Sequence, residues 1–494
     1  LVIAAAACYA LYYITTSIQL YRARQKIIKD NGCQPAVWFP LKDPFLGIDI
    51  LRENVKFMKE RRFCHESYLR FQRLGNTYRS KMFWRKLIVT REPENVKTIL
   101  SINFKDYCLG KFRLPLMGPL LGEGIFTTDG DRWAHSRAMI RPNFVREQVA
   151  DLPSFEKHLK LLFNQIPRDG STFDLQDLFF KFTLDSATEF LFGTSTNSLS
   201  GNEDETTLES QFARSFCLVQ ESLAKRARFG ELVWLFPEGE KVKEATKICH
   251  AFVDMYVEKA LEYRKRVDIE KNPEEDKYVF LYELAKHTTD KLRLRSELLN
   301  VLLAGRDTTA SLLSNMMFEI SKQPAIWQKI REEVAPLNGQ LPTYEQLRNF
   351  KFIKYCINES LRLHPVVPGN SRLATSDTIL PLGGGPHGRS PLFVPAGTLV
   401  VYSPYSMHRR ADFYGPDALV FRPARWEALR PGWEYLPFNG GPRICLGQQY
   451  ALTEAGYVVA RLAQEVERVE ARGAGEWVEW LTLSVACWGG VRVG

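Results

Sequence analysis

A cysteine near the carboxyl end of the chain has surroundings that would favour a charged thiolate. Cys445 lies in a glycine-rich stretch, 438–447, and the apolar pattern of a helix follows over 448–462. Backbone N–H groups and the helix dipole favour negative charge at the amino end of a helix, so the position stabilises a thiolate. Arg443 adds a cation two residues before the cysteine, and Phe438 can shield the sulfur from water.

Two glycines in the same stretch, Gly441 and Gly447, would let the backbone approach a bulky planar group closely. The alternative is a buried structural cysteine in a turn. That alternative would suffice for a lone cysteine, but it does not account for the glycines, the arginine and the aromatic residue around this one.

A second pattern places an acid beside an alcohol inside an apolar helix. Between residues 298 and 318 the charged side chains are Arg306 and Asp307, and Thr308 follows directly. A buried acid beside a hydroxyl is costly unless it has a use. Asp307 and Thr308 could bend the helix and hold water beside a cofactor. The residues alone leave open a kinked core helix without a chemical role.

Two further pairs each share one face of a predicted helix. Glu359 and Arg362 stand at i and i+3, a spacing that brings opposite charges together but is usually solvated. Trp133 and Arg137 stand at i and i+4 and present an indole N–H beside a guanidinium. Cations of this kind are needed wherever carboxylates are buried.

These patterns, in their order along the chain between residues 100 and 465, resemble the cytochrome P-450 monooxygenases. The glycine-rich stretch matches the family's haem-binding signature at Phe438, Gly441, Arg443, Cys445 and Gly447. The resemblance implies that Cys445 is the axial thiolate ligand of haem b (iron protoporphyrin IX) and that the other four residues help to bind the cofactor. A thiolate ligand pushes electron density onto iron and favours O–O cleavage.

The same resemblance implies roles for the other motifs. Asp307 would feed protons and Thr308 would steady the bound peroxide, with O2 and electrons from NADPH delivered through a separate flavoprotein reductase. A buried structural charge network behind the haem would consist of Glu359, Arg362 and Arg425. The implied partners of the haem propionates are Trp133, Arg137, Arg443 and, as weaker candidates, Arg372 and His408.

The elements that must position these residues are mostly helical. Apolar periodicity predicts helices over 150–165, 176–192, 207–225, 240–266, 296–322, 324–334 and 345–362. Short β signals occur at 76–90, 372–380 and 392–402, and two polar stretches, 195–207 and 381–391, predict surface loops. Because regular βαβ alternation is missing, we expect a mainly α fold with small β-sheets (α+β). The resemblance makes this the cytochrome P-450 fold, with one large haem-enclosing domain over 46–494.

The first segment predicts a membrane anchor. Residues 1–21 carry no charge, and four basic residues follow over 22–29. About 20 apolar residues span a bilayer, and basic residues directly after the span place the rest of the chain in the cytosol. We therefore expect a transmembrane anchor over 1–21, a basic and proline-rich linker over 22–45, and a catalytic domain facing the cytosol at the endoplasmic reticulum. A cleaved signal peptide is the alternative, but its basic residues would precede the apolar run.

Composition narrows the class of protein and its partners. The 494 residues are 45% hydrophobic and 25% charged, which is typical of a globular protein large enough to enclose a cofactor. Nine scattered cysteines argue against a disulfide framework and a structural zinc site. The net charge of +9 is spread along the chain without a basic and aromatic block, which argues against nucleic acid. It suits membrane lipid and an acidic reductase.

The substrate class depends on a closer resemblance. Five stretches look like the fungal branch that hydroxylates alkanes and fatty acids: 120–127, 135–142, 368–374, 405–410 and 447–456. This implies a lipophilic substrate hydroxylated at its terminal carbon, in a channel walled by 111–126, 208–235, the helix near Leu302 and 366–368. The alternatives are a hydroxylase of a sterol or secondary metabolite, a haem-thiolate isomerase or dehydratase, and a membrane haem-binding protein.

Overall fold

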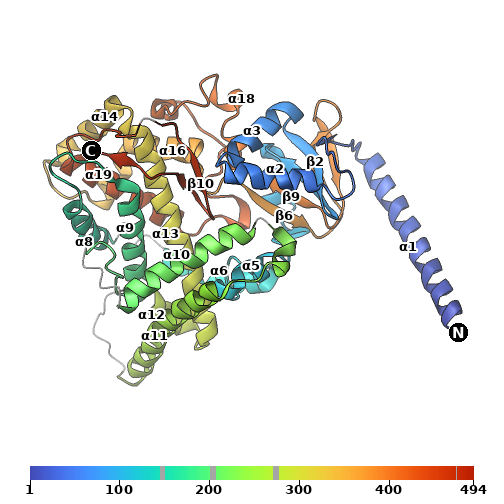
Figure 1. Cartoon of the computed structure of the whole chain (residues 1–494), viewed down its shortest axis with the longest axis horizontal. Helices are drawn as coiled ribbons and strands as arrows, with labels where there is room; N and C mark the ends of the chain where they lie inside the picture. The colour runs from blue at the N-terminus through green and yellow to red at the C-terminus, as the bar shows by residue number, and fades with distance from the viewer. Residues whose placement is uncertain (145–150, 201–206, 228, 271–277, 474) are drawn as a thin grey trace.

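The computed structural model describes residues 1–144, 151–200, 207–227, 229–270, 278–473 and 475–494. Helices form the larger part of the body, and most strands lie together at the end from which α1 (Val2–Asp30) projects (Figure 1). The predicted mainly α fold with small sheets is confirmed.

A long helix, α13 (Lys291–Ser321), runs through the interior of the body. Its side chains are buried on nearly every face, unlike those of a surface helix, which are buried along one stripe. It packs against α9 (Leu175–Phe192), α19 (Gln448–Glu465), α16 (Lys351–Leu363) and α5 (Arg113–Leu121). The acid and alcohol predicted in α13 therefore lie among elements far apart in the sequence.

The remaining helices surround this core. The chain before α13 forms α2 (Ile48–Lys59), α3 (Phe63–Leu74), α4 (Pro93–Lys97), α6 (Gly130–Ile140), α8 (Leu152–Asn164), α10 (Leu208–Ala227), α11 (Glu240–Glu270) and α12 (Phe280–His287). The chain after it forms α14 (Pro324–Val334), α15 (Tyr344–Asn349), α17 (Pro404–Met407) and α18 (Ala411–Tyr414).

The described strands form one six-stranded sheet and three pairs. The sheet has the order β1 (Val37–Trp38), β2 (Thr77–Met82), β3 (Arg85–Thr90), β9 (Leu399–Tyr402), β6 (Asn370–Ala374) and β4 (Tyr107–Cys108). The pairs are β7 (Thr378–Gly384) with β8 (Ser390–Val394), β10 (Glu479–Leu481) with β11 (Val485–Cys487), and β12 (Arg492–Val493) with β5 (Phe173–Asp174).

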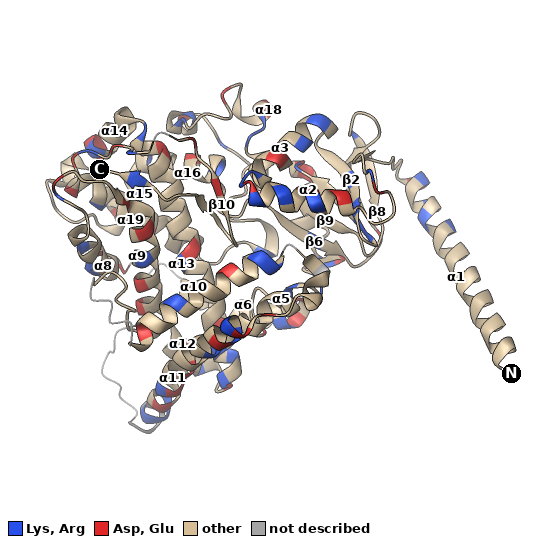
Figure 2. Cartoon of the chain, viewed as in Figure 1, with Lys and Arg blue, Asp and Glu red and all other residues tan. Residues whose placement is uncertain are grey.

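The first helix is longer than the predicted anchor. α1 continues to Asp30, because no helix breaker occurs before Gly32, which has a φ of +62°. The basic part of the expected linker is therefore helical, and Arg24 donates to both carboxylate oxygens of Asp377 at 2.8 and 2.9 Å. α1 is long and apolar enough to cross a membrane. Its outer part carries no charged residue, and its basic residues lie close to the body (Figure 2).

The single helix predicted over 345–362 is wrong. The backbone is extended at Phe350, with φ −66° and ψ 99°, and separates α15 from α16. The N–H groups of Phe352 and Ile353 donate to the carboxylate of Glu333 at 2.8 and 2.9 Å. Because α14 supplies this cap, the break depends on a contact that periodicity does not encode.

The predicted strands and loops also differ in part. The β signal at 372–380 contains the end of β6 and the start of β7, and β7 continues to Gly384 inside the loop predicted over 381–391. In the other predicted loop, the N–H of Ser198 donates to buried Asp185, so this part is packed against α9. Residue 150 of a predicted helix and residues 201–206 of that loop lie outside the described residues.

Candidate active site

The loop that carries Cys445 turns sharply before α19. Gly441 has a φ of +68°, and a Cβ there would lie 1.8 Å from the carbonyl oxygen of Leu100, so only glycine fits. The N–H of Cys445 donates to the carbonyl of Phe438 at 3.0 Å. Gly447 directly precedes α19 and has a φ of −83°, and a Cβ there would have its nearest contact at 3.7 Å. The protein by itself therefore requires glycine at 441 but not at 447.

The sulfur of Cys445 opens into a cavity of about 770 Å³. The lining residues are Trp133, Arg137, Arg141, Pro142, Phe144, Pro442, Ile444, Cys445 and Leu446. This size falls within the roughly 300–1,000 Å³ of small-molecule and cofactor sites. Cys445 is solvent-accessible through this cavity, although protein surrounds its sulfur on the other sides.

Burial and two neighbouring groups act on the pKa of the Cys445 thiol in opposite directions. Burial raises the pKa of the thiol above its ordinary value, while the N–H of Gly447 and the charge of Arg137 lower it by less. The backbone donor expected at the helix start is present, but desolvation outweighs it. A metal cation bound to the sulfur would reverse this balance, because a coordinating thiol is deprotonated.

Helix α6 places the predicted indole and guanidinium pair beside the cysteine loop. Arg137 donates to the carbonyl of Ile444 at 2.9 Å. The guanidinium of Arg443 lies 4.3 Å from the ring centre of Trp133. Arg443 also donates to Asp129 at 2.7 Å. The structure thus brings together residues from two predicted motifs that are more than 300 positions apart.

A cluster of arginines continues from Arg443. Arg113 donates to the side-chain oxygen of Asn370 at 2.9 Å, and Arg372 donates to the same oxygen at 3.2 Å. Burial lowers the pKa of Arg113 to about 10 and that of Arg443 to about 10, and repulsion from Arg372 contributes to both shifts. Asp129 opposes the shift at both arginines, so one carboxylate balances several cations.

Sequence reasoning missed Arg113, whose signal is a lone cation at the start of the apolar helix α5. Sequence reasoning also included His408 as a weaker candidate for binding a haem propionate. The structure places His408 outside the lining of the larger cavity and in contact with Arg362. His408 is fully buried, its Nε2 accepts from the N–H of Leu436 at 2.9 Å, and its carbonyl accepts from Arg362. Burial and nearby arginines lower its pKa to about 3, so it is neutral and structural.

The acid and alcohol of α13 bond to different partners within an unbroken helix. Thr308 donates to the carbonyl of Ala304 at 2.7 Å, so its hydroxyl bonds back along the helix without bending it sharply. Asp307 accepts from Arg306 at 2.7 Å. Burial raises the pKa of Asp307, and the charge of Arg306 opposes this shift.

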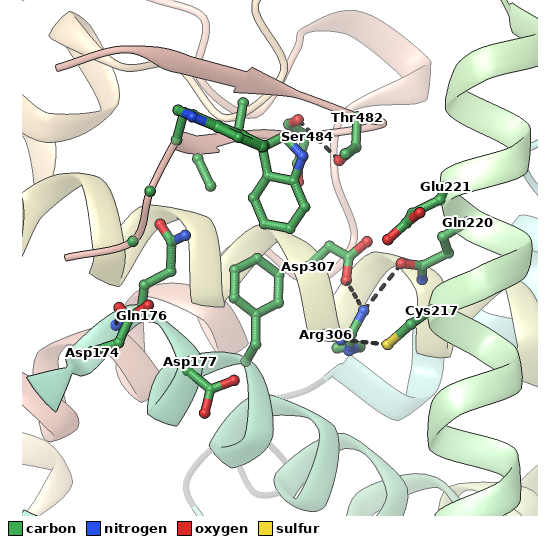
Figure 3. A pocket seen from close by; sticks show the side chains of 16 residues that line it. Asp174, Gln176, Asp177, Cys217, Gln220, Glu221, Arg306, Asp307, Thr482 and Ser484 are labelled. Atoms are coloured by element: carbon green, nitrogen blue, oxygen red, sulfur yellow. Dashed lines mark hydrogen bonds and ion pairs between the residues drawn. The ribbon is translucent and has the colours of Figure 1, made fainter. Parts of the chain in front are cut away.

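Arg306, which sequence reasoning left without a role, connects Asp307 to a second cavity of about 370 Å³ (Figure 3). Its guanidinium donates to Gln220 at 3.1 Å and to the sulfur of Cys217 at 3.0 Å, both on α10. Acidic and polar side chains line much of this cavity, among them Asp177 and Glu221. Water in the cavity could therefore reach the Asp307 carboxylate.

A second buried acid, Glu454, was also missed. It is 1% exposed on α19, accepts from the hydroxyl of Ser186 at 2.7 Å, and is hydrogen-bonded to Thr309. Burial raises its pKa to about 7. The signal in the sequence was one acidic residue in the apolar run of α19. Glu454 thus connects the helix that follows Cys445 with the residue next to Thr308.

The predicted charge pair on α16 is fully buried and belongs to a larger network. Arg362 donates to both oxygens of Glu359 at 2.8 Å, and Arg425 donates to the same carboxylate at 2.8 Å. Trp426 adds a fourth donor at 3.0 Å. Burial alone would raise the pKa of Glu359, but these donors hold it below its ordinary value. The three residues predicted to form a network are in contact.

The residues around the larger cavity fit a haem group. A thiol faces the cavity from a loop in which glycine is required. Nearby lie buried Arg372 and the half-buried Arg113, Arg137 and Arg443, and Asp129 is the carboxylate that balances them. An anionic group with two carboxylates would compensate these charges, since buried cations and carboxylates need each other. Apolar side chains such as Phe144 and Leu446 would cover a planar ring.

Comparison with known proteins gives the same assignment. A family model described as Cytochrome P450 matches residues 50–470. The chain is 49% identical over 489 residues to "Cytochrome P450 monooxygenase himC" of Aspergillus japonicus, across 97% of this chain and 88% of that protein. It is 48% identical over 465 residues to "Cytochrome P450 52E1" of Candida apicola, across 90% and 87%. The chain therefore belongs to the cytochrome P450 family and is a haem-thiolate monooxygenase.

Proposed function

We propose that Cys445 is the axial ligand of the haem iron and that the enzyme hydroxylates the terminal carbon of long-chain alkanes or fatty acids. The observation that carries the first part is the position of Cys445 at one cavity with half-buried arginines, Arg137 and Arg443, beside it. When bound, the haem supplies the binding and activation of O2, and the thiolate favours O–O cleavage.

The chain's own residues would hold the cofactor in two ways, by cations at its carboxylates and by the loop that carries Cys445. Five side chains would bind the two carboxylates of the haem: the indole N–H of Trp133 and the guanidinium groups of Arg113, Arg137, Arg372 and Arg443. Gly441 keeps the loop close to Leu100 and so fixes the position of the sulfur. Phe438 and Gly447 would lie against the ring system beside Cys445.

Asp307 and Thr308 would move protons to the oxygen side of the site. Burial raises the pKa of Asp307 and so favours proton uptake relative to an ordinary aspartate, while the charge of Arg306 opposes this shift and so favours release. Arg306 holds the Asp307 carboxylate at the smaller cavity, from which water can resupply the proton (Figure 3). Thr308 would release its bond to Ala304 to donate a hydrogen bond into the site.

The substrate proposal draws on the sequence stretches that look like the fungal alkane- and fatty-acid-hydroxylating branch. Each buried CH2 is worth about 0.8 kcal/mol, so a dodecyl chain gains up to about 10 kcal/mol before entropy costs. A polar anchor is therefore unnecessary. Relatives named in the Cytochrome P450 52 series cover most of this chain at 43–48% identity.

A second candidate is a different lipophilic substrate, such as a sterol or secondary metabolite. It is favoured by relatives outside that series, including "Cytochrome P450 monooxygenase fsdH" of Fusarium heterosporum, 46% identical over 494 residues and 98% of this chain.

We further propose that α1 anchors the enzyme in the endoplasmic reticulum membrane, with residues 1–21 in the bilayer and the domain over 46–494 in the cytosol. The apolar outer part of α1 and the basic residues that follow it support this orientation (Figure 2). Electrons would come from NADPH through a flavoprotein reductase that docks on the Cys445 side, and the net charge of +9 favours an acidic partner.

A binding titration tests the proposed function. The full chain, purified with haem, is titrated with lauric acid, dodecane and a sterol while the ferric spin state is followed by absorbance. We expect the two linear compounds to shift the iron from low to high spin, and a reconstituted assay with reductase and NADPH to yield the terminal alcohol. A shift with the sterol alone would overturn the substrate class, and a protein that fails to bind haem would overturn the role of Cys445.

A further inference from the structure

The predicted surface loop over 381–391 belongs to a hairpin that contacts the end of the anchor helix. In Figure 2, β8 lies at the end of the body from which α1 projects. β7 and β8 pair antiparallel, with Thr378 opposite Val394 at the open end and Gly384 opposite Ser390 at the turn. The two ends of β7 are about 20 Å apart, since a strand rises by about 3.3 Å per residue. The hairpin can therefore hold another segment at two separated points.

The segment that follows α1 is fixed at the turn end of this hairpin. The N–H of Gln34 donates to the carbonyl of Pro391 at 2.9 Å. The N–H of Gly385 donates to the carbonyl of Pro35 at 3.0 Å. A Cβ on Gly384 would lie 2.5 Å from the carbonyl oxygen of Gln34, so glycine lets the turn approach this segment. Glycine in the predicted loop thus serves the contact with the chain that follows the anchor.

An ion pair fixes α1 itself at the open end of the same hairpin. Asp377 directly precedes β7, and Arg24 donates to both of its carboxylate oxygens at 2.8 and 2.9 Å. The N–H of Ala396, which lies between β8 and β9, also donates to this carboxylate at 2.8 Å. The side chains of Arg24 and Asp377 are 27% and 18% exposed. A bidentate ion pair that is largely shielded from water is stronger than an ordinary surface pair.

The half-buried residues in the last turns of α1 share one face of the helix. Arg24, Ile27 and Ile28 are half-buried, whereas Arg22 is exposed. Residues spaced by three and four positions are neighbours on a helix surface. Arg24 lies about 9 Å before the end of α1 at Asp30, because a helix rises by about 1.5 Å per residue. A helix tied at one point could turn about that point, but ties at two separated points fix its direction.

We propose that Arg24 and Asp377 clamp α1 to the β7–β8 hairpin and thereby fix the angle at which the catalytic domain sits on the membrane. The inference rests on the proposed anchoring of residues 1–21, but the clamp itself does not depend on it. Arg24 follows the uncharged segment by three residues, so the clamp places Asp377 at the level of the lipid headgroups. The domain then keeps one face toward the bilayer, in which a lipophilic substrate is dissolved.

The first experiment uses no membrane. Amide hydrogen exchange is measured on the haem-loaded full chain in detergent for wild type, Arg24→Ala and Arg22→Ala. Arg22 is a matched control, because it lies on the same helix but is exposed, so its replacement removes the same charge and leaves the pair with Asp377 intact. We expect exchange at Gln34 and Gly385 to rise about tenfold in Arg24→Ala alone. Unchanged exchange there would overturn the clamp whatever the membrane.

The second experiment measures how the domain is oriented on a bilayer. The haem-loaded full chain is placed in oriented bilayers of phosphatidylcholine and phosphatidylserine, and the linear dichroism of the haem absorption reports the angle of the haem to the membrane plane. We expect wild type and Arg22→Ala to give the same dichroism. Arg24→Ala and Asp377→Asn should lose most of it, because the domain then turns about a single tie.

A charge swap, Arg24→Glu combined with Asp377→Arg, should restore the dichroism, which a merely destabilised hairpin would not explain. Equal dichroism in wild type, Arg24→Ala and Asp377→Asn would contradict the proposal. A wild type that does not sediment with vesicles of the same lipids contradicts the proposed anchor instead, and the exchange measurement then decides the clamp by itself.

Discussion

The hydroxyl of Ser186 on α9 donates to Glu454 on α19 over 2.7 Å, and this hydrogen bond lowers the pKa of the acid by less than burial raises it. Burial raises that pKa from 4.5 to about 7. The folded protein therefore binds this proton more tightly than the unfolded chain does. Stability should fall as the pH rises from about 4.5 to about 7 and should then stay level.

Glu454→Gln is expected to remove this dependence. The shift corresponds to about 3 kcal/mol of unfolding free energy between pH 4.5 and pH 8, given about 1.4 kcal/mol per pKa unit. Urea unfolding at pH 5 and pH 8 checks the prediction. Asp377→Asn is the control, because hydrogen bonds from Arg24 and Ala396 lower the pKa of Asp377 and so move its titration below this range. An equal pH slope in wild type and Glu454→Gln would refute the prediction.

Cys445→Ser should abolish the thiolate-type absorption of the reduced carbon monoxide complex. The sulfur is the group that faces the larger cavity from the glycine-rich loop, and a hydroxyl does not replace it as a soft ligand. Difference spectroscopy of purified protein measures this. Cys33→Ala, at a half-buried position after α1, should keep the wild-type spectrum. A thiolate-type band in Cys445→Ser would show that another residue binds the iron.

Thr308→Ala should uncouple NADPH use from product formation. The variant lacks the hydroxyl that would donate into the site, and loss of a proton-transfer group typically costs about 10²–10⁴-fold in rate. We expect product per NADPH to fall at least about tenfold with release of peroxide. Ser314→Ala is the matched control, because Ser314 makes the same bond to the carbonyl four residues earlier in α13, at 2.6 Å. Similar coupling in both variants would argue against the role of Thr308.

Arg362→Ala should destabilise the domain and prevent stable haem loading. Its removal leaves the fully buried Glu359 short of its main partner, and breaking such a buried pair costs about 3–5 kcal/mol. Thermal unfolding and haem content are the measurements. Arg422→Ala removes a half-exposed arginine paired with Asp417 and should change stability by less than about 1 kcal/mol. A stable, haem-loaded Arg362→Ala protein would show that the network is dispensable.

Residue patterns along the chain predicted those parts of the site that a single segment forms. The acid and alcohol of α13 and the pair Glu359 and Arg362 follow from residue type and helical spacing. The pattern of the cysteine loop predicted Gly441 as a site residue. The contact that requires glycine there is with the carbonyl of Leu100, which is 341 residues away in the sequence. The backbone donor expected beside Cys445 is present at Gly447, whereas the burial that raises the pKa of the thiol depends on tertiary packing.

The sequence by itself determined the family, the helical class, the apolar first helix and the motif residues, because these depend on periodicity and on neighbours along the chain. Only the tertiary structure decided that Arg113 and Arg372 share Asn370, that Arg306 holds Asp307 at a second cavity, and that Asn300 accepts from Phe126 in the loop between α5 and α6. The physical reason is that burial and charge pairing depend on segments that lie 86 to 257 residues apart in these contacts, and no spacing rule along the chain encodes their approach.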